Sequence, residues 1–282
     1  VQQVRALAQL LGSEAIRSAR EGNMGAAAER LREGFVLSRH LCQTRDAAAI
    51  VAAAGVDQEL AGAAAEVLSA GAMPVDDARR LSAELGSLDY YAALGRVVDA
   101  ECARVLSGVA QADAERTSGL WQRMTRAVDK VSGARDARVL ERIETLERLR
   151  EVLTQPWREA SKQTEPLLSR SVGSVRAHVP TPGPFVACRV SLCRDNAIAR
   201  RALVQAALAL GEHRSRHGAY PQRLSDARIE GLKIPADVYS GRPLIYRAKG
   251  DRLDLGSVGG DLVEGGTQAD DIIWGARSQG RT

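Results

Sequence analysis

The stretch from residue 218 to residue 274 constrains the fold most, because it cannot continue the helical pattern that precedes it. Pro221 lacks a backbone N–H group and fixes its own φ angle, so a helix ends before it. Three short runs beyond it are typical of β-strands: residues 244–246, 253–255 and 272–274. Lys249-Gly250-Asp251 lies between the first two runs and is typical of a hairpin turn. The stretch therefore predicts a small antiparallel sheet beside a helix.

Residues 1–175 predict a mainly α-helical domain built from helical hairpins. Hydrophobic residues make up 45% of the chain and aromatic residues only 4%, and cores dominated by Ala and Leu are usually helical. The first hairpin is expected to join residues 1–20 to a helix over 24–42 through the turn Glu21-Gly22-Asn23. This hairpin resembles one tetratricopeptide-type repeat, although no second copy follows at a period of roughly 34 residues.

A proline cluster at positions 180, 182 and 184 separates the two parts, because proline removes backbone donors and excludes the α-region before it. We expect a helical scaffold domain over residues 1–175, a Pro-rich connection over 176–194, and a small α+β module over 195–282. The helix of this module is expected to begin near Asp195, and strands are expected only after about residue 235.

The last third of the chain carries three motifs in an order that resembles a known family. They are the helix exit Gly218-Ala219-Tyr220-Pro221, the turn Asp237-Val238-Tyr239-Ser240-Gly241-Arg242-Pro243, and the Gly- and acid-rich loop from Val258 to Asp271. Together they resemble the globular part of the major pseudopilin of type II secretion systems. The resemblance implies one helix packed on a short antiparallel sheet, and a calcium site in the loop.

Asp261, Glu264, Asp270 and Asp271 are the candidate calcium ligands of this loop. Carboxylates are hard oxygen ligands, and calcium takes six to eight such oxygens in a flexible geometry. Two departures from the family pattern oppose the site, because Leu262 replaces a usual Gly and Thr267-Gln268 stand where acids are common. A metal-free turn is therefore the alternative hypothesis.

Charge and cysteine content bound the partners and the compartment. The net charge is +4, from 39 basic and 35 acidic residues, and no block of Lys and Arg predicts a nucleic-acid partner. Cys188 and Cys193 can close a small loop as a disulfide in an oxidising compartment, or can stay as two buried thiols. Cys42 and Cys102 are expected to be buried in helices.

The sequence contains no nucleophile elbow, P-loop or dinucleotide fingerprint, which lowers the expectation of an enzyme. We expect a non-enzymatic bacterial cell-envelope scaffold or interaction protein with a protein partner. It is expected to be periplasmic or otherwise exported, and a membrane anchor can precede Val1. The spacing of His213 and His217 can hold a metal, but a solvent-facing pair is favoured.

Two alternatives stay open. The first is an adaptor whose helical hairpins bind a peptide, in which the main aromatic residues line a groove instead of forming the core: Tyr90, Tyr91, Trp121 and Trp157. The second is a hydrolase with a site between the two domains.

Overall fold

The structure is a computed structural model that describes residues 2–115, 134–160, 184–227, 234–250, 252–260 and 272–274. The described helices are α1 (Gln2–Arg20), α2 (Met24–Gln43), α3 (Ala47–Ala70), α4 (Val75–Gly86), α5 (Tyr90–Glu115), α7 (Ala134–Leu153) and α9 (Pro184–His217). The strands are β1 (Ile245–Lys249), β2 (Arg252–Ser257) and β3 (Ile272–Ile273), and they form one antiparallel sheet in the order β1-β2-β3. Within the described residues, the predicted mainly helical fold with a small antiparallel sheet late in the chain is confirmed.

Local sequence signals explain where the first helices begin and end. Gly22 adopts a positive φ of 81° at the end of α1, a conformation that costs glycine little. The side chain of Asn23 then accepts a hydrogen bond from the backbone N–H of Ala26 and caps α2. Asp46 caps α3 in the same way through Ala48. These signals set the end of α1 and the starts of α2 and α3, and apolar side chains of the three helices pack in one cluster.

Helix α3 is the centre of the helical bundle and packs against α1, α2 and α9. It runs parallel to α1, because the ion pairs Arg5–Glu59 and Arg20–Glu66 join the two helices in ascending order. By length and composition alone, α3 is the one described helix that is apolar enough to cross a membrane, and 56% of its apolar window is buried inside this fold. A buried core helix passes the same test.

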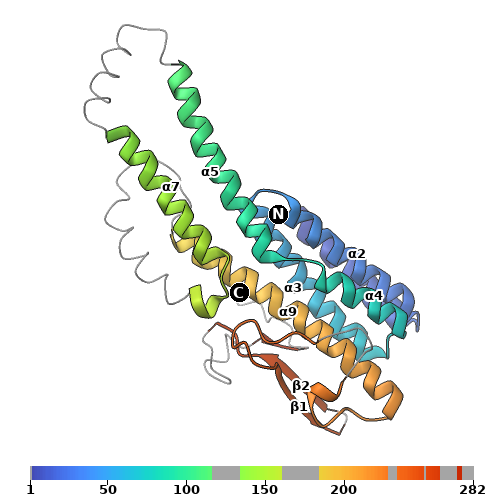
Figure 1. Ribbon diagram of the computed structural model, residues 1–282. Coiled ribbons are helices and arrows are strands. Elements are labelled where there is room, and N and C mark those ends of the chain that lie inside the picture. Colours follow the sequence, from blue (N-terminus) through green and yellow to red (C-terminus); the bar gives the residue numbers. More distant parts are fainter. Residues whose placement is uncertain are drawn as a thin grey trace, which may run out of the picture.

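Helix α9 lies between the bundle and the sheet, and Figure 1 shows the helices on one side of it and the strands on the other. Its side chains Val204 and Leu208 belong to the same apolar cluster as α1–α4. The side chains of Leu203 and Leu210 pack in a second cluster with Leu255 of the sheet. The helix therefore has two buried faces, and it is shared by both parts of the molecule.

The expectation that this helix begins near Asp195 is wrong, because α9 begins at Pro184. Proline is tolerated in the first turn of a helix, where its missing N–H would have no intrahelical partner. The boundary expected between residues 194 and 195 consequently falls inside a continuous helix of 34 residues.

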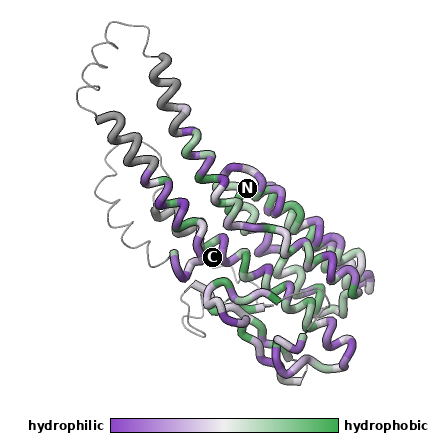
Figure 2. Tube along the Cα trace, in the orientation of Figure 1, coloured by the Kyte–Doolittle hydropathy of each residue, from purple (hydrophilic) through white to green (hydrophobic). Residues whose placement is uncertain are grey.

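Helices α5 and α7 pack against each other and form an arm that extends beyond the bundle in Figure 1. The described part of α7 is mostly hydrophilic, as its colour in Figure 2 shows. Helix α5 reaches Glu115, although its last residues are mostly polar. Trp121 lies outside the described residues.

Strands β1 and β2 form the predicted hairpin. Lys249 pairs with Arg252 across the turn, where Gly250 has a φ of 58°, and Leu255 pairs with Tyr246. Strand β3 pairs with the end of β2, so that Ser257 lies opposite Ile272.

Candidate functional site

The predicted calcium ligands Asp261, Glu264, Asp270 and Asp271 lie outside the described residues, but both ends of their loop are described. The pairing of Ser257 with Ile272 brings the two ends side by side. Gly259 has a φ of 69° at the start of the loop, which favours glycine there. Among the described residues, no group of three or more metal-ligating side chains occurs. The sheet thus closes the base of the acidic loop, and the ligation itself stays a prediction.

Asp237 is a buried carboxylate beside the start of this loop, and the sequence analysis did not single it out as a site residue. It accepts hydrogen bonds from the hydroxyls of Ser257 at 2.6 Å and Ser240 at 2.8 Å. The backbone N–H groups of Tyr239 and Ser240 also donate to it, each at 3.3 Å. Because Asp237 is only 1% exposed to solvent, these hydrogen-bond donors must replace water around its carboxylate. Asp237 therefore fixes the predicted turn against the last residue of β2.

Trp157 connects the same loop to the helical part. Its indole Nε1–H donates to the carbonyl of Gly260 at 3.0 Å, and its backbone N–H donates to the carboxylate of Asp195 at 2.6 Å. The neighbouring Arg158 donates to the carbonyl of Ser240 at 3.3 Å. Trp157 and Gly260 are 103 residues apart in the sequence, so the spacing of apolar residues along the sequence could not reveal this contact.

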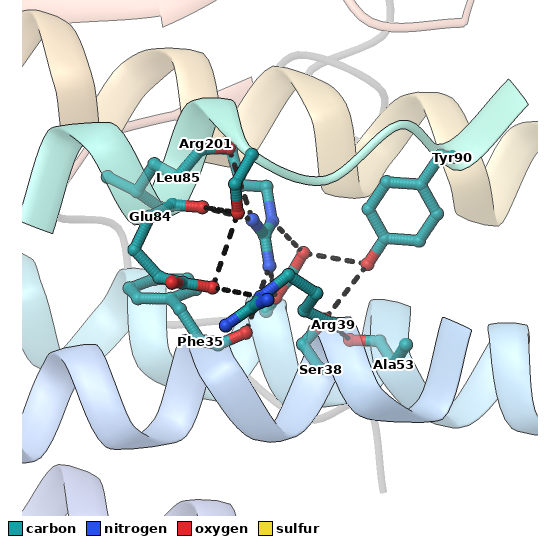
Figure 3. Close-up of polar contacts among 10 residues, drawn as sticks. Phe35, Ser38, Arg39, Ala53, Glu84, Leu85, Tyr90 and Arg201 are labelled. Carbon is teal, nitrogen blue, oxygen red and sulfur yellow. Dashed lines mark hydrogen bonds and ion pairs between the residues drawn. The ribbon is translucent and has the colours of Figure 1, made fainter. Parts of the chain in front are cut away.

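A buried ion pair between Arg201 of α9 and Asp57 of α3 holds the bundle together (Figure 3). Nε and Nη2 of Arg201 donate to the two carboxylate oxygens of Asp57 at 2.5 and 3.0 Å, in a bidentate arrangement. Burial lowers the pKa of Arg201, but the charge and hydrogen bonds of Asp57 outweigh it and raise that pKa above its ordinary value. Arg201 is therefore a permanent cation.

The surroundings of this pair satisfy the remaining polar atoms. Tyr90 donates its hydroxyl proton to Asp57 at 2.7 Å, and the Ser38 hydroxyl lies 3.3 Å from the same tyrosine oxygen. Burial and the nearby Asp57 charge raise the pKa of Tyr90 well above its usual range. Arg201 also donates to backbone carbonyls: those of Phe35, Glu84 and Leu85. Tyr90 is therefore a core residue with a structural partner.

A second buried pair joins α9 to α5 and α7. Arg194 donates to Asp195 at 2.6 Å and to the carbonyl oxygens of Leu153 and Gln155 at the end of α7. Its guanidinium carbon lies 4.3 Å from the ring centroid of Tyr91, a cation–π contact. Charged residues within otherwise apolar helices were the sequence signal for both pairs, but the identity of each partner required the fold.

The cysteines divide by burial. Cys42 is fully buried in α2, as expected, and burial raises the pKa of its thiol to about 12. Cys102 is only half-buried in α5. Cys188 and Cys193 lie in the continuous helix α9, which opposes the disulfide loop and favours the alternative of two thiols. Residues five apart in a helix are offset by roughly 140° about its axis, which opposes a disulfide between them.

Two further features lie at the surface of the described part of the chain: a cleft and a pair of histidines. A shallow open cleft on α2 and α4 is lined by Glu29, Arg32, Arg80, Ala83 and Glu84. The His213 and His217 rings lie 4.3 Å apart near the end of α9, and no metal-ligating group of three includes them among the described residues.

Comparisons with protein-family models, with curated proteins and with solved structures found no match. The site is therefore interpreted from its own chemistry.

Proposed function

We propose that this chain is a non-enzymatic scaffold of the bacterial cell envelope, in which a helical bundle that binds a protein partner carries a pseudopilin-like calcium module. The observation that carries this proposal is the placement of α9. One face of α9 packs on the antiparallel sheet, as the pseudopilin resemblance implies, and the other face packs in the bundle. The sheet is thereby fixed to a rigid support.

The same placement argues for a support and against a polymerising pilin subunit. Pilins of the family resembled here assemble through an apolar helix that precedes the globular part. In this chain the corresponding helix carries Arg194, whose guanidinium contacts Asp195 and the end of α7, and Arg201, whose guanidinium contacts Asp57 of the bundle. Such a helix has no free apolar face along these contacts to offer to other subunits.

The scaffold role also agrees with how the buried polar groups are used. Asp57, Tyr90 and Arg201 hydrogen-bond with one another and with backbone atoms. Between α9 and the sheet, the described residues form an apolar cluster that includes Leu203 and Leu255. This packing favours a scaffold over a hydrolase with a site at that junction.

Calcium binding is tested by thermal unfolding of metal-stripped protein. We expect the midpoint to rise in calcium, because a metal that binds only the folded state stabilises it by about 2.7 kcal/mol at a hundredfold excess over its dissociation constant. Asp261→Ala should abolish the rise, and Asp226→Ala, which changes an exposed acid outside the loop, should retain it. Equal midpoints in calcium and in chelator would show that the loop is a metal-free turn.

Location is tested separately, by fractionating cells that express the complete natural gene with a C-terminal tag. The envelope proposal expects the protein in the periplasmic or membrane fraction. Recovery in the cytoplasm alone would contradict it without affecting the calcium test.

The adaptor role is the second candidate, and the cleft on α2 and α4 favours it. Arg32 pairs with Glu29 at 2.6 Å, and Glu84 pairs with Arg39 at 2.8 Å, so the cleft carries charges of both signs. A photo-crosslinker at Ala83 should capture a partner in cells, and Arg80→Glu in the same protein should prevent that capture. Capture that is unchanged by Arg80→Glu would argue against docking in the cleft.

A further inference from the structure

Arg200 differs from the two arginines that flank it on α9. Arg194 and Arg201 are matched by Asp195 and Asp57, and both also donate to backbone carbonyls. Arg200 is half-buried, yet its guanidinium group makes no hydrogen bond or ion pair with any residue in the described part of the chain. Burial lowers the pKa of Arg200, and electrostatic interactions with Tyr239, Asp57 and Cys193 do not outweigh that effect. A partly desolvated cation without an acceptor is costly unless a ligand supplies one.

Asn196 lies four residues before Arg200 and shares its side of α9. The hydroxyl of Tyr239 donates to Oδ1 of Asn196 at 2.6 Å, which identifies the amide oxygen as the acceptor. The amide NH2 group of Asn196 has no acceptor among the residues that the structure describes. Two sets of unused N–H donors therefore lie one helical turn apart.

These donors remain accessible to solvent. No side-chain atom of Asn196 or Arg200 is among the described polar atoms that are fully buried without a hydrogen-bond partner. A ligand can consequently reach them without unfolding α9. Tyr239 itself is fully buried and fixes the orientation of the amide, so it is a positioning residue.

We propose that Asn196 and Arg200 bind a carboxylate group of a protein partner. A guanidinium group matches a carboxylate with two parallel N–H···O bonds, and the amide NH2 can donate to the same group. The charges of Arg194 and Arg201 are already matched, so within the described residues of this part of α9 Arg200 contributes a single unmatched positive charge. One unmatched charge fits a monoanionic carboxylate better than a dianionic phosphate. This proposal adds a ligand chemistry to the scaffold role and does not depend on calcium.

The test uses acetate as the probe and the full chain as the protein. The side-chain Nε–Hε resonance of Arg200 is followed by NMR during titration with sodium acetate, and sodium chloride at the same ionic strength is the reference. We expect a saturable shift with acetate at millimolar concentrations, and a smaller response to chloride and to inorganic phosphate. Identical responses to acetate and chloride would overturn the proposal, because only screening would then be observed.

Two variants separate binding from folding. Asn196→Asp supplies a carboxylate within the chain, keeps an acceptor for Tyr239, and should abolish the acetate response while the protein stays folded. Arg200→Met should also abolish the response, read from the backbone amides of residues 193–203, and should leave the unfolding midpoint unchanged or higher.

Arg5→Met is the matched control. Arg5 forms an exposed ion pair with Glu59 of α3, whereas Arg201 of α9 pairs with Asp57 of α3. The acetate response should persist in this variant. A large loss of stability in Arg200→Met, or an acetate response that survives it, would show that Arg200 is not the anchor.

Discussion

At the scale of single residues, the buried Arg201–Asp57 ion pair joins α3 to α9. We predict that Arg201→Met lowers the free energy of unfolding by about 3–5 kcal/mol, because Asp57 would keep a buried charge without its partner. Urea denaturation measures this loss. Arg5→Met, which removes an exposed pair, should cost at most about 1 kcal/mol. Equal losses in the two variants would contradict the assigned role.

Cys42 predicts how stability changes in alkali. Burial raises the pKa of its thiol from 9.0 to about 12, so the folded state keeps a proton that the unfolded state loses. The contribution is complete below about pH 9 and is lost as the pH rises toward about 12. The free energy of unfolding should fall in this range by up to about 1.4 kcal/mol per pH unit for this group.

The control is Cys42→Ala, which should reduce the slope of the free energy of unfolding against pH. It should not abolish that slope, because the tyrosines that also titrate in alkali remain. An unchanged slope in Cys42→Ala would assign the pH dependence to other groups. The native thiol should also react slowly with iodoacetamide.

Residue-level detail could be predicted only where a signal is local. The cap by Asp46 and the turn at Gly22 follow from neighbouring residues, and the structure contains both. Arg201 and Asp57 are 144 residues apart, and nothing local in the sequence indicates which acid pairs with which arginine. The ligands of the acidic loop stay a prediction.

At the scale of elements, two glycines test how closely α2 and α3 pack. A Cβ atom at Gly34 of α2 would lie 2.6 Å from the methyl groups of Leu60, which is fully buried, so Gly34→Ala should destabilise by about 1–3 kcal/mol. Gly62 of α3 is exposed and has open space, so Gly62→Ala should stabilise by about 0.5–1 kcal/mol. Thermal unfolding of both variants checks the opposite signs, and equal signs would contradict the packing.

The elements themselves were mostly predictable, since periodicity and turn residues place α1 to α4 and the β1–β2 hairpin. The start of α9 was missed because Pro184 was interpreted as a break, whereas proline is compatible with the first turn of a helix. The end of α5 is not predictable from its polar last residues, because polarity alone does not distinguish a solvated helix from a loop.

At the scale of the whole molecule, α9 makes the bundle and the sheet one folding unit. We predict that a fragment of residues 195–282 does not fold alone, because Val204 and Leu208 would be exposed and Arg201 would lose Asp57. Circular dichroism should show no cooperative unfolding of the fragment, and the full chain should unfold in one transition. A fragment with a sharp transition would instead establish an independent C-terminal domain.

The shared helix also has a mechanical consequence. A helix of 34 residues is about 50 Å long, and α9 packs on α3 and, over residues 202–210, also on the sheet. A pull on the sheet along the axis of α9 loads these contacts in shear, so that many of them bear the force at once. A pull across the axis would instead separate the contacts one after another. We therefore expect the fold to resist a pull along the axis of α9 better than a pull across it.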